Sequence, residues 1–235
     1  MFISPFSLLR PFENRLTIGL FTKADDIRTD ADTARTLVMK DVATAKILGA
    51  KNAASLNQMH GKRTVIVREP TNRPEQADGM ITDVPGLALC IRWADCQNFV
   101  VYAPDHHVLG AVHIGWRCLR DGTIPSFFEM LKREFDIDAE ECLVAGGPSL
   151  CMKCGEFSDP LSEIPNVPQS FVSGKLVDLR GWALQQFTDA GVDIKNIEMH
   201  LDCTRCHPET YWTYRGGGRE EVKSGYVNML VCCLK

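Results

Sequence analysis

The sequence lacks an excess of positive charge, a long apolar run and a basic leader, and each absence argues against a class of protein. Lys and Arg total 26 against 30 Asp and Glu, which gives a net charge of −4 at pH 7. Electrostatics therefore give no reason to expect nucleic acid or an anionic membrane as a partner. No apolar run approaches the roughly 20 residues of a membrane-spanning helix. The apolar segment from Met1 to Arg10 has no basic stretch before it and no clear cleavage site after it, which favours a terminal strand over a signal peptide.

Internal repeats, low-complexity tracts and linker-like segments are also missing, so we expect residues 1–235 to form a single domain. Helical spacing predicts three helices, and continuous apolar runs predict strands between them. The predicted class is therefore α/β, a single domain with a mixed β-sheet flanked by helices. The expected helices are 34–48, 124–135 and 178–190; the expected strands are 17–22, 64–67, 87–91, 99–102, 108–113, 142–145, 197–201 and 222–234.

Cysteine, by contrast, is abundant, with ten residues. In a chain of this size without an export signal we expect reduced thiols, which favours the cytoplasm. Four of them form two C-x-x-C pairs, Cys151 with Cys154 and Cys203 with Cys206. Such pairs often hold a structural zinc, but 48 residues separate Cys154 from Cys203, far beyond the usual spacing of about 15–20. We therefore expect unpaired thiols that line a pocket, with a second metal or an iron–sulfur site as the alternative.

The most informative residues are Cys96 and His113, which lie 17 positions apart among strongly apolar runs. Cys96 follows Asp95 in the loop between two predicted strands, and His113 begins the segment His-Ile-Gly-Trp-Arg at the end of the next strand. Gly115 would free the backbone to turn at this point. Asp95 would either orient a ligand histidine or cap a turn. His60, in the segment Gln-Met-His-Gly, supplies a second imidazole.

Two chemistries follow from this set of side chains. Two histidines and one cysteine are enough ligands for a catalytic zinc that keeps its fourth position for water or substrate. A cysteine and a histidine alone would serve as a thiolate nucleophile and its base. Arg117 has the planar fork that holds an anion, unless it forms a surface salt bridge instead. The residues by themselves leave metal-activated water and cysteine hydrolysis both open.

Several short segments, taken in order, resemble one family. They are 58–61, 77–82, 94–96, 113–117, 147–149, 178–179, 203–204 and 214–215. The family is the laccase-domain family, described as polyphenol oxidoreductases and as zinc-dependent purine nucleoside phosphorylases with adenosine deaminase activity. The resemblance covers roughly residues 15–234, and the ordered His, Asp-Cys and His-x-Gly-Trp-Arg set is its specific part. It implies a single α/β domain that also resembles the bacterial toxin cysteine deamidases.

The resemblance also implies a metal and a substrate class. His60, Cys96 and His113 would be the zinc ligands, and zinc would lower the pKa of a water molecule for attack at C6 of adenosine. Phosphorolysis would cleave the bond between a purine and C1′ of its ribose. The expected partners are therefore a purine nucleoside and phosphate.

The implied phosphate site departs from the family pattern. Arg117 would position phosphate, with Asp95 as a supporting group. Family members usually carry an Arg-x-Gly-Gly-Val-Ser loop after the first strand, whereas this chain has residues 22–26, in which only Lys23 could replace the arginine. We therefore expect deamination to survive better than phosphorolysis.

Three other functions stay open. Cys96 activated by His113 would hydrolyse an amide or acyl group, and zinc would inhibit that reaction. A metal- or nucleoside-binding protein would keep the site without turnover. Copper-dependent oxidation of phenols ranks last, because one cysteine and two histidines cannot hold the several coppers of a multicopper oxidase. The native metal and the oligomeric state do not follow from the sequence.

Overall fold

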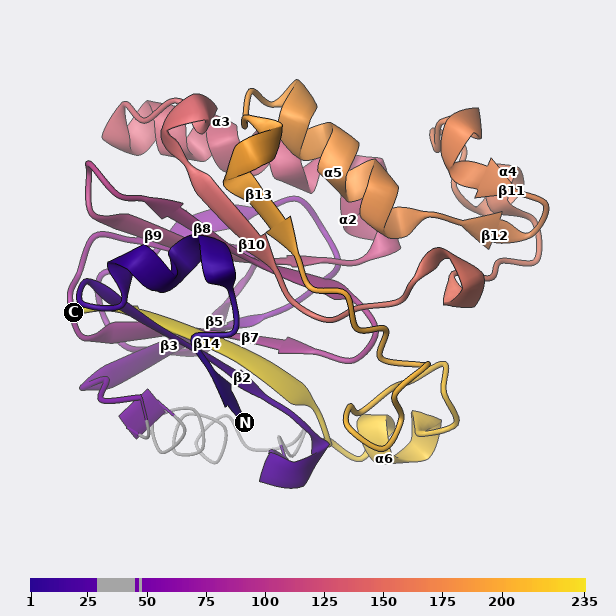
Figure 1. Ribbon diagram of the computed structural model, residues 1–235, viewed down its shortest axis with the longest axis horizontal. Helices are drawn as coiled ribbons and strands as arrows, with labels where there is room; N and C mark the ends of the chain where they lie inside the picture. Colours follow the sequence, from indigo (N-terminus) through magenta and orange to yellow (C-terminus); the bar gives the residue numbers. More distant parts are fainter. Residues whose placement is uncertain (29–44, 47) are drawn as a thin grey trace.

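Most of the strands belong to two six-stranded sheets that pack face to face (Figure 1). The computed structural model describes residues 1–28, 45–46 and 48–235. The first sheet has the strand order β1 (Phe2–Ile3), β2 (Leu16–Phe21), β14 (Asn228–Leu234), β7 (Leu87–Trp93), β3 (Asn52–Asn57) and β5 (Thr71–Gln76). The second has the order β13 (Ile197–Met199), β10 (Leu143–Gly146), β8 (Gln97–Ala103), β9 (Val108–Ile114), β6 (Gly79–Thr82) and β4 (Thr64–Ile66). Each sheet mixes parallel and antiparallel pairs.

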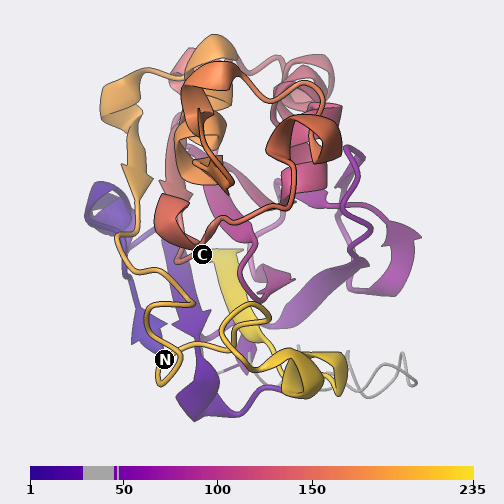
Figure 2. The same cartoon turned by 90° about the vertical axis from the view of Figure 1, so that its right-hand side faces the viewer.

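The longer helices cover the outer face of the second sheet (Figure 1, Figure 2). They are α2 (Trp116–Asp121), α3 (Thr123–Phe135) and α5 (Leu179–Asp189). The shorter elements are α4 (Pro160–Glu163), α6 (Arg219–Lys223), a two-stranded sheet of β11 (Val172–Ser173) and β12 (Leu176–Val177), and the 3-10 helices η1 (Ser7–Phe12), η2 (Lys23–Asp25), η3 (Ala139–Glu141), η4 (Met152–Cys154), η5 (Gln169–Phe171) and η6 (Ile194–Asn196). Within the described ranges, no helix is both long and apolar enough to cross a membrane.

The central core lies between the two sheets. Leu89 of β7, Leu109 of β9 and Leu230 of β14 belong to this core and are fully buried. Their strands are covered on both faces, so they are almost continuously apolar instead of alternating with polar residues. This double burial is why the apolar runs of the sequence predict these strands so well.

A second core lies between the outer face of the second sheet and the helices. Ile124, Phe127 and Leu131 of α3 recur at helical spacing and are buried. The Phe127 ring packs against β9 at Gly110, where a Cβ would overlap the ring. The close packing of α3 on β9 therefore requires a residue without a side chain at position 110.

The predicted α/β class is confirmed, with the strands divided between two mixed sheets where one was expected. The predicted helices 124–135 and 178–190 correspond to α3 and α5, and the predicted strands from 17–22 to 197–201 are found within two residues of their expected bounds. No pattern in the sequence indicated β3, β5 or β6. The predicted helix 34–48 lies largely outside the described residues.

Both chain ends differ from expectation. Only β1 is extended at the N-terminus, and η1 follows it. The strand predicted over 222–234 begins at Asn228, because α6 occupies the first part of that segment. The residues of α6 are mostly polar and none is buried, so this segment forms a short helix at the surface. Only the continuous apolar run after it enters the sheet.

Three chain segments that carry polar motifs meet at one end of the two sheets. The loop from β3 to β4 passes from the first sheet to the second, and so does the loop from β7 to β8. Strand β9 returns antiparallel to β8, which places His113 opposite Asn98. The candidate site is built at this end.

Candidate functional site

The two crossing loops and the end of β9 bring His60, Cys96 and His113 together, and we call these three residues the His2Cys site. Their ligand atoms all lie within 4.8 Å of one another. His60 Nε2 is 3.9 Å from Cys96 Sγ, and the two imidazole rings meet edge to face with centroids 4.8 Å apart. His113 is buried, whereas His60 and Cys96 are half-buried. The three predicted ligands therefore converge, with one side of the group accessible.

Asp78 organises two of these three residues. Its Oδ1 lies 2.8 Å from His113 Nδ1, and its carboxylate accepts backbone N–H bonds from Met59, His60 and Gly61. A carboxylate on Nδ1 fixes the orientation of the ring and leaves Nε2 for a metal. Burial raises the pKa of Asp78, but the hydrogen bond and charge of His113, with the backbone N–H groups of Gly61 and His60, hold that pKa below its usual value. Asp78 therefore remains an anionic support for the His113 imidazole and for the backbone at His60.

Gly115 fits against the His2Cys site because it has no side chain. Its φ of −82° and ψ of 173° are open to any residue, so the expected need for a free turn is not the reason for glycine here. A Cβ at this position would lie 2.9 Å from His60 Cδ2 and 3.3 Å from Cys96 Sγ. Any larger residue would push the two ligands away from their present positions.

Asp95 supports the loop around Cys96. Its Oδ1 accepts from Thr204 Oγ1 and Thr213 Oγ1 at 2.6 Å each, and its Oδ2 accepts from the backbone N–H of Arg215 at 2.7 Å. Its φ is +77°, a left-handed conformation that a non-glycine residue holds only when its surroundings fix it. Among the described residues, Asp78 and not Asp95 contacts a ligand histidine, so Asp95 takes the turn-stabilising role of the two that the sequence left open.

Cys96 and His113 form an ion pair. Burial raises the pKa of the Cys96 thiol, but the charge of His113 and hydrogen bonds from His113 and His60 outweigh it and lower the pKa to about 6. Burial lowers the pKa of His113, while the Cys96 thiolate and the Asp78 carboxylate raise it well above its usual value. A thiolate at neutral pH is the form that both a metal and a nucleophilic mechanism require.

The His2Cys site lines a cavity of about 630 Å³, a size typical of small-molecule sites. Arg92, Arg117 and Arg215 also line it, together with the largely apolar side chains of Trp116, Leu150, Leu179, Tyr214, Val222 and Val227. The Arg117 guanidinium is exposed, lies 4.2 Å from the centroid of the Trp116 ring, and forms no hydrogen bond or ion pair with the residues that the structure describes. Arg117 is thus positioned to meet an anion that enters the cavity.

Lys23 is placed elsewhere. Its Nζ donates to the carbonyl of Pro208 at 3.1 Å and lies 4.8 Å from the centroid of the Trp212 ring. It is not among the described residues that line the cavity. Its position gives no support to the phosphate-binding role expected from the sequence, because the ammonium is already engaged by a neighbouring loop.

Some residues of the site carried little signal in the sequence. Asp78 stands between an alanine and a glycine just before β6 and could have been recognised only as the acidic partner of a ligand histidine. Tyr214 and Arg215 belonged to the resemblance without a role. Arg215 closes one side of the cavity, with its guanidinium 4.8 Å from the centroid of the Phe157 ring and bonded to the carbonyl of Glu156. Long-range contacts of this kind have no local sequence pattern.

The described residues contain a second group of soft donors outside the cavity. Cys151, Cys154, Cys203 and Cys206 have sulfur atoms within 4.8 Å of one another, and we call these residues the four-cysteine cluster. None of the four is among the described residues that line the cavity. The four thiols are unpaired, as expected. They do not line the cavity of the His2Cys site but gather in a cluster of their own, because two loops that are remote in sequence meet in space.

Comparison with known sequences identifies relatives of this chain. A family model described as "Multi-copper polyphenol oxidoreductase laccase" matches residues 20–233. A protein of Bacteroides thetaiotaomicron named purine nucleoside phosphorylase is 28% identical over 160 residues, which are 64% of this chain and 58% of that protein. A protein of Aquifex aeolicus with the same name is 29% identical over 154 residues, 65% of this chain and 71% of its own length. A protein named adenosine deaminase RL5, from an unknown prokaryotic organism, is 25% identical over 166 residues, 65% of this chain and 62% of that protein.

Comparison of structures shows the same fold in two solved proteins. The hypothetical protein YfiH of Bacillus licheniformis superposes with a TM-score of 0.82 at 21% identity, covering 95% of this chain and 94% of that one. YlmD of Geobacillus stearothermophilus superposes with a TM-score of 0.79, also at 21% identity, over 96% of this chain and 94% of its own. The likeness extends over almost the whole described fold. The sequence alignment, by contrast, spans less than two thirds of the Bacteroides relative.

Proposed function

This chain belongs to the multi-copper polyphenol oxidoreductase laccase family, and we propose that it is a single-domain, zinc-dependent enzyme acting on purine nucleosides. The observation that carries the proposal is the His2Cys site in the wall of a cavity that also presents Arg117. The names of the relatives supply the substrate class. The proposed reactions are phosphorolysis of adenosine or inosine to the free base and ribose 1-phosphate, and deamination of adenosine with water to inosine and ammonia.

The residues of the site fit a metal ion. Asp78 holds His113 with Nε2 directed away from its own carboxylate, and Gly115 leaves room where a Cβ would press on His60 and Cys96. One thiolate and two imidazoles form a donor set of catalytic zinc, although the same set also occurs around single copper ions. When bound, zinc would supply a Lewis acid that lowers the pKa of water. His60, Cys96 and His113 are its proposed ligands.

The remaining cavity residues suit the two parts of a nucleoside substrate. Trp116, Leu150 and Leu179 provide apolar surface for a purine. Arg117 is proposed to bind phosphate, because its planar fork matches an oxyanion and makes no competing ion pair with the described residues. Arg215 also lines this cavity, and its backbone N–H is held by the Asp95 carboxylate. Phosphate binding would then rest on these arginines without Lys23.

A second candidate is favoured by the pKa of about 6 for Cys96. The imidazole of His60 lies 3.9 Å from the Cys96 sulfur, and His113 is within 4.8 Å of it. The thiolate would attack an amide or acyl carbon as a nucleophile. Zinc would inhibit this reaction, since it would occupy the attacking sulfur. The ten free cysteines fit the reducing cytoplasm in which we place the protein under either proposal.

The deciding experiment follows adenosine and inosine by liquid chromatography, with and without phosphate. Zinc and copper are first measured in protein purified without added metal. If the zinc enzyme is correct, a chelator stops formation of inosine, hypoxanthine or adenine, and added zinc restores it. If Cys96 is the nucleophile, chelation leaves hydrolytic activity intact, and iodoacetamide abolishes it in the metal-free protein. Absence of product from either nucleoside with zinc and phosphate present would reject the proposed function.

Arg117 offers a separate test of the phosphate site. Arg117→Lys keeps the charge but loses the bidentate fork, so we expect the KM for phosphate in phosphorolysis to rise roughly tenfold, equivalent to about 1.4 kcal/mol, with little change in Tm. Arg120→Lys is the matched control, because Arg120 also lies over the Trp116 ring, at 5.5 Å, but pairs with Asp121 and does not line the cavity. Equal effects of the two changes would contradict the role of Arg117.

A further inference from the structure

The four-cysteine cluster is assembled by two loops that leave neighbouring parallel strands. β10 and β13 pair in parallel, with Gly146 opposite Met199. The segments that follow these two strands continue beyond the sheet and pair once more through an isolated bridge between Ser149 and Cys203. Strands that run in parallel deliver their following loops to the same edge, so the first C-x-x-C pair and the second come side by side despite their separation in sequence.

Arg180 of α5 holds the two loops in register. Its Nε donates to Ser149 Oγ at 3.0 Å, and its Nη1 donates to the carbonyls of His200 and Leu201 at 3.2 and 3.1 Å. The guanidinium is thus bonded to the loop that precedes each cysteine pair. The position of the cluster therefore depends on the hydrogen bonds of Arg180 as well as on the cysteines.

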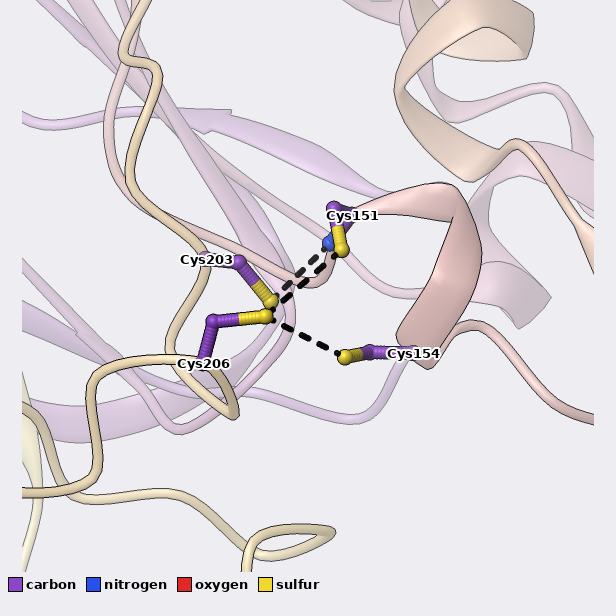
Figure 3. A group of neighbouring side chains, drawn as sticks. All are labelled: Cys151, Cys154, Cys203 and Cys206. Atoms are coloured by element: carbon purple, nitrogen blue, oxygen red, sulfur yellow. Dashed lines mark hydrogen bonds between the residues drawn. The ribbon is translucent and has the colours of Figure 1, made fainter.

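Each C-x-x-C pair forms the same tight turn. Cys154 donates its backbone N–H to the carbonyl of Cys151 at 2.9 Å, and Cys206 donates to the carbonyl of Cys203 at 3.1 Å. The backbone N–H of Cys151 points to Cys203 Sγ at 3.2 Å across the two loops. In Figure 3 the four side chains point toward one common centre. An N–H donor directed at sulfur stabilises the thiolate, which is the metal-binding form.

The distances between the sulfur atoms match one metal ion. Cys154 Sγ and Cys206 Sγ are 3.6 Å apart, Cys151 Sγ and Cys206 Sγ are 4.0 Å apart, and all four lie within 4.8 Å. A tetrahedral ion with metal–sulfur bonds of about 2.3 Å sets its thiolates roughly 3.8 Å apart. An iron–sulfur cluster divides its four thiolates among two or more iron atoms, so thiolates bound to different irons would lie further apart. Disulfides would need sulfur atoms at about 2 Å.

We propose that Cys151, Cys154, Cys203 and Cys206 bind one zinc ion as a closed, structural site. Four soft thiolates and no carboxylate select zinc over magnesium or calcium. Four protein ligands also leave no open coordination position, in contrast to the His2Cys site. The described cluster thus has the donor number, the donor type and the spacing of a structural zinc.

The proposed ion would stabilise the loop that carries Cys96. Thr204, which follows Cys203 directly, donates to the Asp95 carboxylate, and Leu150, which precedes Cys151, donates its N–H to the Asp95 carbonyl at 3.1 Å. Both segments tied by the ion therefore contact Asp95, the neighbour of Cys96. The closed site would hold one wall of the cavity in place without touching the substrate.

Metal content separates this proposal from the proposed function. In protein purified without added metal, elemental analysis is expected to give two zinc ions per chain. Cys206→Ser and Cys96→Ala are each expected to retain one, and the double variant none. Cys206 is exposed, so its change should not perturb packing. Lys153→Ala, an exposed position inside the first pair, is the matched control and should retain two. Two zinc ions in Cys206→Ser would overturn the proposal, whatever the activity.

Cobalt reports the ligands directly. In the Cys96→Ala background, Co²⁺ is expected to give the intense sulfur-to-metal charge-transfer and visible bands of tetrahedral thiolate coordination. Cys151→Ser in that background should weaken these bands, and circular dichroism would verify that the variant is folded. Absence of the bands, or a mass of the unreduced protein showing disulfides among the four cysteines, would overturn the proposal.

Discussion

The His2Cys site and the four-cysteine cluster both gather soft donors from separate loops, but they differ in number of donors and in surroundings. The first has three donors and borders a cavity of about 630 Å³. The second has four donors and is absent from the described lining of that cavity. Three protein ligands leave a position for substrate, whereas four close the coordination sphere. The difference indicates that a zinc ion would take part in catalysis at the His2Cys site and would stabilise loops at the four-cysteine cluster.

The residues that support the two groups also differ in what they contact. Asp78 orients a ligand imidazole and thereby sets the chemistry of the His2Cys site. The four-cysteine cluster is supported by Arg180, which bonds to backbone and to a serine hydroxyl and so fixes loop positions. Asp78 thus orients a ligand side chain, whereas Arg180 fixes the backbone of the loops that carry the ligands.

Thermal stability should show the largest difference. Losing a structural ion present at a thousandfold excess over its Kd removes about 4 kcal/mol, and each kcal/mol corresponds to about 2–4 °C in a domain of this size. We expect Cys206→Ser to lower Tm by roughly 10 °C in zinc-containing buffer. Cys96→Ala should abolish turnover, yet lower Tm by only about 2 °C, since the coordination it loses is incomplete. Differential scanning calorimetry measures both, and equal losses of Tm would remove the distinction between the two groups.

Asp78 gives the next largest effect. Asp78→Asn replaces an acceptor oxygen with an amide and weakens the orientation of His113, so we expect zinc to bind the His2Cys site about 10–100 times more weakly. Competition with a fluorescent chelator measures this Kd, while the four-cysteine cluster in the same protein should keep its affinity. Loss of zinc from both groups would show that Asp78 acts on the fold as a whole.

The pH dependence of thiol reactivity should show the smallest effect. The pKa of Cys96 is lowered to about 6 in the metal-free protein, so its thiolate forms as the pH rises through that value. Alkylation of Cys96 should therefore increase only about twofold between pH 6 and pH 8, whereas an ordinary thiol with a pKa of about 8.5 gains close to a hundredfold. Peptide mass spectrometry after brief treatment with iodoacetamide resolves the site. A hundredfold rise at Cys96 would contradict the ion pair with His113.

Much of the fold could be predicted because its central strands are buried on both faces. β7, β8 and β9 are continuous apolar runs, and α3 has a clear helical repeat. β3 escaped prediction, since its Asn-Ala-Ala-Ser-Leu-Asn sequence is short and made of small residues. The division into two sheets also escaped, because pairing partners are chosen by long-range packing and not by local pattern.

The order of the donors along the chain was enough to identify His60, Cys96 and His113 as a set. The strands that flank Cys96 and the strand that carries His113 were also predictable, because burial on both faces leaves a visible apolar run. Folding was needed to show that Asp78 faces His113, that Lys23 is engaged away from the cavity, and that Cys151 meets Cys206. Sequence spacing measures distance along the chain, whereas parallel pairing of β10 with β13 sets two remote loops at one edge. That pairing, which no local pattern records, creates the four-cysteine cluster.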